Sequence, residues 1–77
     1  MTKQIVKEVM ASVFEIDANT ISDDASQKTI SKWDSLEHLN LIVELEEKFN
    51  LSFEPTEIGE MVSLDKIVLI IEKLNNA

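Results

Sequence analysis

The chain has 77 residues and contains no cysteine, one glycine and one proline. Without cysteine, neither a disulfide framework nor a thiolate metal site can form, so the core must come from aliphatic packing. The scarcity of glycine and proline argues against a β fold with many turns and favours helices. Apolar residues make up 44% of the chain, which is an ordinary share for a folded domain. We therefore expect one small all-α domain over residues 1–77.

Long apolar runs are also absent. No run approaches the roughly 20 residues that a membrane-spanning helix needs. The apolar residues near the beginning are interrupted by Lys7 and Glu8, which is unlike the apolar region of a signal peptide. We expect a cytoplasmic protein that does not insert into membranes. Nothing in the sequence requires an oligomer, so we expect a monomer.

Basic residues are few. The chain has 7 of them against 15 acidic residues, so the net charge is −8. Such a charge is repelled by phosphate groups, so we expect no binding to nucleic acids or to anionic membranes. The charge favours partners with basic surfaces. Acidity that only keeps a small protein soluble is the alternative.

Apolar residues at helical spacing predict a first helix over about residues 2–14, with Thr2 as a candidate N-cap. Its expected core face consists of Ile5, Val6, Val9, Met10, Val13 and Phe14. A connector rich in Asp, Asn, Ser and Thr follows over residues 15–33. We expect its three isoleucines to contact the core, namely Ile16, Ile21 and Ile30. A connector of this length often carries function or crosses between distant helix ends.

The second half of the chain contains two further helix signals. Asn50 can end a central helix, and a short helix is expected over about residues 55–60. Ser63 is a candidate N-cap for the last helix, which we expect to fray at residues 75–77. The apolar stripe of that helix is Leu64, Ile67, Val68, Ile71 and Leu74. The sequence therefore predicts a small bundle of three main helices plus one short helix.

The central segment, residues 34–49, contains a helix together with its start signal. Asp34 is a favoured N-cap residue, and Glu37 follows at the spacing of a capping box. If Asp34 is the cap, Ser35 is the first helical residue. Its hydroxyl is then not needed for capping and is free to point into solvent.

The apolar residues of this helix fall into two arcs at about 100° per residue. One arc is a core face made of Leu41, Ile42, Leu45 and Phe49. The other, here called the apolar strip, consists of Leu36, Leu39 and Val43. Together the arcs are about twice as wide as the roughly 100° stripe of an ordinary surface helix. Because so small a chain has few elements to cover the strip, we expect it to be partly exposed beside Ser35.

Catalytic residues are scarce. Ser35 and His38 could form a nucleophile and base at i, i+3 on one helix, but no orienting acid and no glycine-rich turn for an oxyanion hole accompanies them. We prefer a partly buried His38 that packs against the connector, and we expect a protein that is not an enzyme. One histidine without cysteine also offers little to a transition metal.

Two further features have ordinary structural explanations. The pattern Asp17-x-Asn19-x-Ile21 begins like a calcium loop, but the ligand, glycine and glutamate that should follow are missing. Trp33 directly precedes the expected cap. We interpret it as a staple residue at the rim of the core, with a partner-facing surface ring as the alternative.

The triplet Asp34-Ser35-Leu36, followed by an amphipathic helix ending in Glu46-Glu47-Lys48-Phe49, resembles the acyl carrier proteins. The likeness covers nearly the whole chain, because the order and lengths of the expected helices agree with that family. The triplet alone is a weak pattern. In an acidic chain of this length with this helix order, it is fairly specific.

The resemblance implies that Ser35 carries 4′-phosphopantetheine, attached by a separate, magnesium-dependent phosphopantetheinyl transferase. The thiol of that group would carry acyl groups as thioesters, which explains a chain without cysteine. Asp34 would assist the transferase at its metal site. The apolar strip would contact acyl ligases, acyltransferases or synthases, and an acidic rim would face their basic docking surfaces. That rim would consist of Glu37, Glu46 and Glu47.

Lys32 and Trp33 stand where the family commonly has a glycine, and Asn40 where many fatty-acid carriers have an acid. With His38, this form resembles the discrete carriers of specialised pathways, so fatty acid and polyketide biosynthesis both remain open. Two alternative functions also remain. One is a carrier of aminoacyl or peptidyl groups loaded by an adenylating ligase. The other is an acidic helical adaptor that is never modified.

Overall fold

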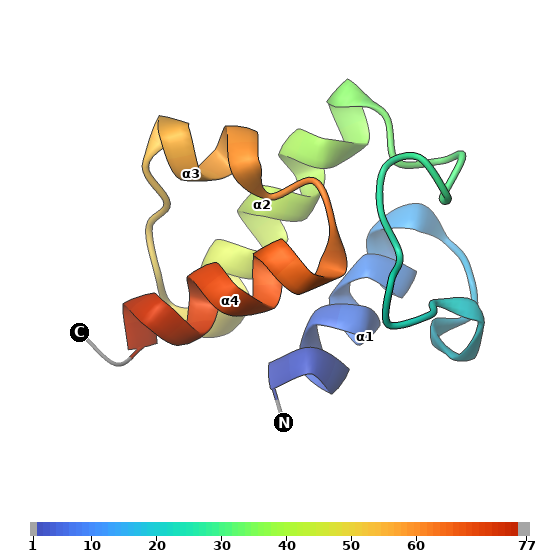
Figure 1. Cartoon of the computed structure of the whole chain (residues 1–77), viewed down its shortest axis with the longest axis horizontal. Helices are drawn as coiled ribbons and strands as arrows, with labels where there is room; N and C mark the ends of the chain where they lie inside the picture. Colours follow the sequence, from blue (N-terminus) through green and yellow to red (C-terminus); the bar gives the residue numbers. More distant parts are fainter. Residues whose placement is uncertain (1, 76–77) are drawn as a thin grey trace.

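A computed structural model describes residues 2–75 of the chain. These residues form four α-helices and one 3₁₀ helix: α1 (Thr2–Phe14), η1 (Ala18–Thr20), α2 (Ser35–Phe49), α3 (Pro55–Glu60) and α4 (Leu64–Asn75). Within residues 2–75 there is no strand, only an isolated bridge between Ser26 and Ser63. The expected all-α bundle of three main helices and one short helix is confirmed (Figure 1).

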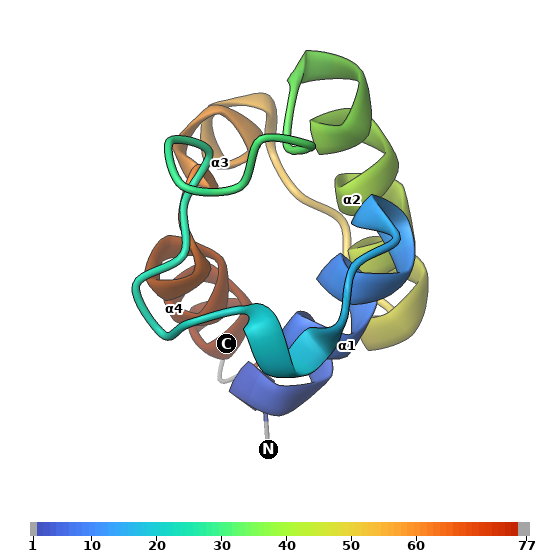
Figure 2. The same cartoon turned by 90° about the vertical axis from the view of Figure 1, so that its right-hand side faces the viewer.

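The four helices surround one interior, with α1 packed against both α2 and α4 (Figure 2). The connector between α1 and α2 passes across the end of the bundle beside the start of α4 before it reaches the start of α2 (Figure 2). The connector thus crosses between distant helix ends, as its length suggested. Among the described helices, none has the length and apolar character to span a membrane.

Each of the three long helices contributes almost fully buried residues to the core. They are Val6, Met10 and Phe14 in α1, Leu41, Ile42 and Leu45 in α2, and Leu64, Ile67, Ile70 and Ile71 in α4. These residues recur at helical spacing, so the predicted core faces are confirmed, and the structure adds Ile70. The other predicted face positions are half-buried, namely Ile5, Val9, Val13, Phe49, Val68 and Leu74.

The connector is more ordered than its polar composition indicates. Ile21 is buried, and Ile16 and Ile30 are half-buried, as expected. The Asp17 side chain accepts a hydrogen bond from the backbone N–H of Asn19 at 2.9 Å and so caps η1. This is a helix cap rather than the beginning of a calcium loop.

Backbone hydrogen bonds join the connector to the start of α4 and to the segment just before it. The N–H of Leu64 donates to the carbonyl of Ala25 at 2.9 Å, and the N–H of Gln27 donates to the carbonyl of Val62 at 3.1 Å. Ala25 is buried, with 2% of its surface exposed. Sequence reasoning missed this pairing, because the partners are far apart in the chain.

Two lysines of α1 hold the connector from outside the core. Lys7 Nζ lies 2.8 Å from an Asp23 carboxylate oxygen, and Lys3 Nζ lies 3.4 Å from the other. The hydrogen bond from Lys7 and the nearby charge of Lys3 hold the pKa of Asp23 below its ordinary value. The carboxylate is exposed, so we assign these pairs a small share of the stability.

Two predictions about the helix ends are wrong. Thr2 is already part of α1 and is not its cap. Asn75 is still part of α4, whereas fraying was expected there; Asn76 and Ala77 lie outside the described residues. Two other predictions are confirmed. Asn50 ends α2 in the left-handed conformation, with φ of 55°, and the Ser63 hydroxyl accepts from the N–H of Lys66 at 3.2 Å.

Candidate functional site

The start of α2 is built as the sequence predicts. Asp34 has extended backbone, and its Oδ1 accepts a hydrogen bond from the N–H of Glu37 at 2.8 Å. This carboxylate satisfies a donor that the helix itself leaves free, so Asp34 is the N-cap. Ser35 is therefore the first residue of α2, and it is exposed. Its side chain is available for chemistry because the cap is supplied by its neighbour.

The second hydrogen bond of the predicted capping box, from the Asp34 backbone N–H to the Glu37 side chain, does not form, so this part of the prediction is wrong. Glu37 Oε1 accepts from the Asn40 side-chain amide at 2.9 Å instead of the Asp34 backbone. The N–H of Asp34 donates to the Lys32 carbonyl at 3.1 Å, so the donor that the box requires is already used. A bond of that kind occurs at α3, where the N–H of Glu54 donates to Glu57 Oε1 at 2.8 Å.

Trp33 and His38 form a buried pair beneath the start of α2. Their exposed fractions are 3% and 9%, and the Trp33 Nε1–H donates to His38 Nδ1 at 3.0 Å. The indole also lies against the ring of Phe14, with centroids 5.4 Å apart. The core-rim interpretation of Trp33 is confirmed, and the alternative of a surface ring for partners is wrong.

The second nitrogen of His38 is also bonded. His38 Nε2 lies 2.9 Å from the carbonyl oxygen of Ile58 in α3. An indole N–H only donates and a carbonyl only accepts, so both contacts require a neutral imidazole with its proton on Nε2. Neither nitrogen is left to accept a proton from Ser35. The imagined pair of Ser35 and His38 is therefore not formed. His38 packs against the connector as expected, and it is buried rather than partly buried.

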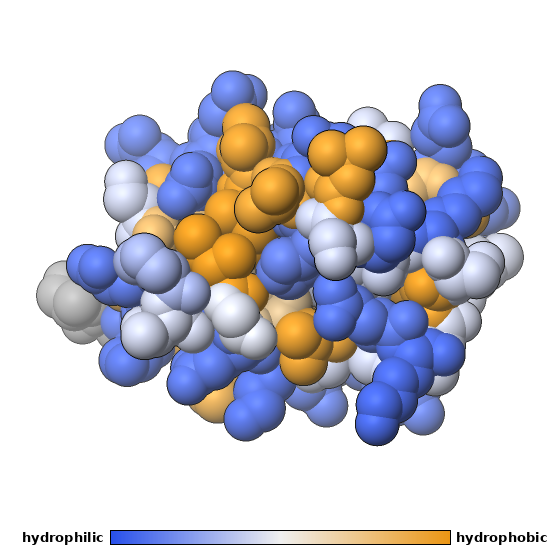
Figure 3. All heavy atoms as spheres, turned by 90° about the horizontal axis from the view of Figure 1, so that it is seen from above, coloured by the Kyte–Doolittle hydropathy of each residue, from blue (hydrophilic) through white to orange (hydrophobic). Residues whose placement is uncertain are grey.

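The apolar strip is exposed. Leu36, Leu39 and Val43 expose 68%, 57% and 52% of their surfaces, as predicted from the excess width of the apolar arc. On the side of the molecule where α3 and the start of α2 lie, apolar atoms gather among hydrophilic ones (Figure 3). Contiguous exposed apolar surface on a small protein marks an interaction site.

The three acids expected to flank the strip differ in their surroundings. Glu47 is exposed, whereas Glu37 and Glu46 are half-buried. Glu46 Oε2 accepts the backbone N–H of Phe53 at 2.9 Å, so it also fixes the segment between α2 and α3. This structural role of Glu46 was not visible in the sequence, because its partner is in an irregular segment.

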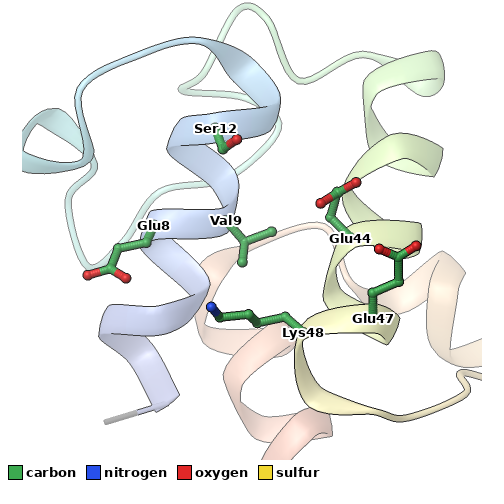
Figure 4. A pocket seen from close by; sticks show the side chains of 6 residues that line it. All are labelled: Glu8, Val9, Ser12, Glu44, Glu47 and Lys48. Atoms are coloured by element: carbon green, nitrogen blue, oxygen red, sulfur yellow. The ribbon is translucent and has the colours of Figure 1, made fainter.

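An open groove of about 410 Å³ separates α1 from the second half of α2. Sequence reasoning did not predict it. Its lining is Glu8, Val9 and Ser12 from α1, and Glu44, Glu47 and Lys48 from α2. The Lys48 side chain extends across the groove toward α1 (Figure 4). Among residues 2–75, no cluster of His, Asp and Glu side chains could hold a metal ion.

Comparison with known proteins identifies the family. No family model matches the chain. The acyl carrier protein of Phytoplasma australiense is 30% identical over 73 residues, which cover 95% of this chain and 96% of that protein. The chain belongs to the acyl carrier protein family.

Two further relatives of this acyl carrier protein agree. Polyketide-8 synthase acyl carrier protein 1 of Streptomyces avermitilis is 24% identical over 71 residues, which cover 92% of this chain and 84% of that protein. The solution structure of a holo acyl carrier protein from Geobacter metallireducens superposes with a TM-score of 0.83 at 28% identity. That match covers 94% of this chain and 83% of the other. The likeness thus extends over the whole bundle.

The family settles the general function. The protein is an acyl carrier protein, and the aminoacyl carrier and the unmodified adaptor are not favoured. The family implies a phosphopantetheine prosthetic group and partners among synthases, acyltransferases and phosphopantetheinyl transferases. Acyl carrier proteins are in general carriers rather than catalysts.

Proposed function

We propose that Ser35 carries 4′-phosphopantetheine and that the chain presents acyl groups on this arm to separate enzymes. The observation that supports the proposal is the exposed position of Ser35 as the first residue of α2, with the cap supplied by Asp34. A serine that had to cap the helix would have its oxygen engaged by a backbone N–H. At this position the hydroxyl is accessible to a modifying enzyme.

The surroundings of Ser35 suit a phosphodiester. The first N–H groups of α2 give this end of the helix a partial positive charge, which favours an anion. The carboxylates of Asp34 and Glu37 oppose that charge, although each has one oxygen in a hydrogen bond. When attached, the group supplies a terminal thiol that can bear an acyl group as a thioester, which this cysteine-free chain cannot supply itself.

The attachment reaction needs one nucleophile from the chain. The Ser35 oxygen forms a P–O bond to the pantetheine-bearing phosphate of coenzyme A, the pyrophosphate bond breaks, and adenosine 3′,5′-bisphosphate leaves. The hydroxyl proton passes to a base of the transferase. We propose that Asp34, whose Oδ1 caps α2, uses its other carboxylate oxygen at the magnesium site of the transferase.

The same end of α2 supplies a docking surface. Leu36 and Leu39 of the apolar strip follow Ser35 within about the first turn of the helix, so a partner bound there lies beside the modified serine. We propose that Glu37 and Glu47 attract basic residues of that partner. Glu46 is proposed to contribute charge while its carboxylate continues to bind Phe53. Charges of this kind mainly speed association and orient the partner.

The test is intact mass after incubation with coenzyme A, magnesium and a broad-specificity phosphopantetheinyl transferase. We expect the wild type to gain the mass of one phosphopantetheine and Ser35→Ala to gain none. Ser12→Ala is the matched control, because Ser12 is another exposed helical serine, in α1, and it should gain the same mass as the wild type. A folded wild type that is not modified, or a Ser35→Ala protein that is, would contradict the proposal.

A further inference from the structure

We infer that His38 is a positioning residue for Ser35, acting through hydrogen bonds of both ring nitrogens to Trp33 and to Ile58. These three residues are here called the His38 bridge. The inference rests on the proposed attachment at Ser35. It adds a residue that touches neither the prosthetic group nor a partner enzyme, but fixes the backbone that presents the serine.

The first half of the bridge holds the residues that lead into Ser35. Trp33 stands two positions before Ser35, and its indole lies near both the Phe14 ring and the imidazole of His38. The N–H of Trp33 also donates to the Ile30 carbonyl at 3.1 Å. Three contacts therefore hold Trp33 in place. Of these, only the contact with His38 comes from α2.

The second half of the bridge connects the start of α2 to α3. His38 Nε2 donates to the Ile58 carbonyl at 2.9 Å, near the end of α3, which is six residues long. So short a helix is not stable by itself, and its position depends on tertiary contacts. The neutral imidazole, fixed as the Nε2–H tautomer, thus links the Trp33 indole to the backbone of α3 through one rigid ring.

Ser35 itself makes no comparable contact with the core, because it is exposed. Its placement comes from the residues around it. The Asp34 side chain bonds the N–H of Glu37, and the Asp34 carbonyl accepts from the N–H of His38 at 2.8 Å. The hydroxyl is thus placed by a segment whose two ends are Trp33 and His38, and the bridge joins these ends directly. Without the bridge, we expect Ser35 to move relative to the apolar strip to which the partner enzyme binds.

The alternative is that His38 only fills space and stabilises the fold. Three substitutions separate the two roles. In His38→Asn, the amide oxygen takes roughly the place of Nδ1 and can accept from Trp33. In His38→Gln, the amide nitrogen takes roughly the place of Nε2 and can donate to Ile58. His38→Phe keeps a flat ring but breaks both bonds. It leaves the buried Trp33 Nε1–H without an acceptor, which is costly, whereas the Ile58 carbonyl keeps its hydrogen bond from the N–H of Met61.

The first experiment tests the bridge without any enzyme. The chain has one histidine, so its ring nitrogens give an unambiguous ¹⁵N spectrum in the unmodified wild type at neutral pH. We expect a single neutral tautomer with the proton on Nε2. A proton on Nδ1, or averaging between the two tautomers, would overturn the inference, because Trp33 could then not donate steadily to Nδ1.

The second experiment measures the kinetics of Ser35 modification at a temperature well below the unfolding midpoint of each variant. We expect kcat to fall about tenfold in His38→Phe, with KM within about twofold of the wild type, because the apolar strip is intact while the nucleophile is misplaced. His38→Asn, which keeps the Trp33 bond, should recover most of the rate. Val68→Ala, a half-buried position in α4, is the control for lost stability and should keep both constants.

The outcomes separate this inference from the attachment at Ser35. If the wild type is modified and His38→Phe retains the wild-type kcat while its unfolding temperature falls, His38 is only structural and the inference is wrong. If the wild type is not modified, the attachment at Ser35 and this inference both fail. The tautomer measurement would still decide in that case whether the bridge exists.

Discussion

Helices α2 and α4 are both amphipathic, but they use their apolar residues differently. In α4, four apolar residues are buried and Leu69 is exposed. In α2, three apolar residues are buried, and three more, the apolar strip, are exposed. Full burial of a leucine is worth about 1.5–3 kcal/mol, so α2 forgoes stability that α4 obtains. The comparison indicates that the second arc of α2 is kept for another molecule.

The strongest test of this comparison replaces one apolar residue in each helix with alanine and compares the two variants. Ile67→Ala in the core of α4 should lower the free energy of unfolding by about 2–5 kcal/mol, measured by urea denaturation. It should leave the KM of the transferase unchanged in the folded protein. Leu39→Ala should change stability by about 0.5 kcal/mol or less, as at other surface sites, and should raise that KM several-fold. Equal effects of both substitutions on stability would contradict the division between core and docking surface.

Substitutions at the N-caps of α2 and α4 should have effects of intermediate size. Asp34→Ala and Ser63→Ala each remove an acceptor for a backbone N–H at a helix start, and each should cost about 1 kcal/mol of unfolding free energy. The loss should be larger for Asp34, because a charged acceptor bonds more strongly. In the mass assay, Asp34→Ala alone should slow modification. Slower modification of Ser63→Ala, which lies outside the site, would show that the assay responds to stability.

The smallest expected effect concerns α1 and the connector. Because Lys7 and Lys3 lower the pKa of Asp23, the folded protein holds the ionised form more tightly than the unfolded chain does. This stabilisation is present above the unfolded-state pKa and is lost as the pH falls through the lowered folded-state pKa. Asp23→Asn should slightly lower the unfolding temperature at neutral pH and not in acid. The difference should shrink in high salt; a difference that persists in acid would point to another cause.

Local patterns predicted much of the fold. The bounds of α2, the Asp34 cap, the end of the helix at Asn50 and the exposed strip all follow from residue types and spacing over one or two turns. Ser35 was also placed correctly at the first helical position. Its role did not follow from position alone, because a serine is ordinary at a helix start, and only the resemblance to acyl carriers assigned it a prosthetic group.

The features that sequence reasoning missed join residues that helical spacing does not relate. His38 and Ile58 come from different helices, Ala25 and Leu64 join the connector to α4, and Glu46 binds Phe53 beyond the end of α2. Their side chains or backbones have many possible partners in the unfolded chain, and no local spacing selects one. The capping box failed for a related reason, because a competing turn had already used the donor of Asp34.

The burial of Trp33 has a practical consequence. It is the only tryptophan of the chain, it lies within two residues of the proposed attachment site, and its indole lies near both Phe14 and His38. Light at the red edge of the protein's near-ultraviolet absorption therefore excites only the Trp33 indole, at the base of the site. The molecule contains its own optical reporter, through which changes at the start of α2 can be followed in real time without a label.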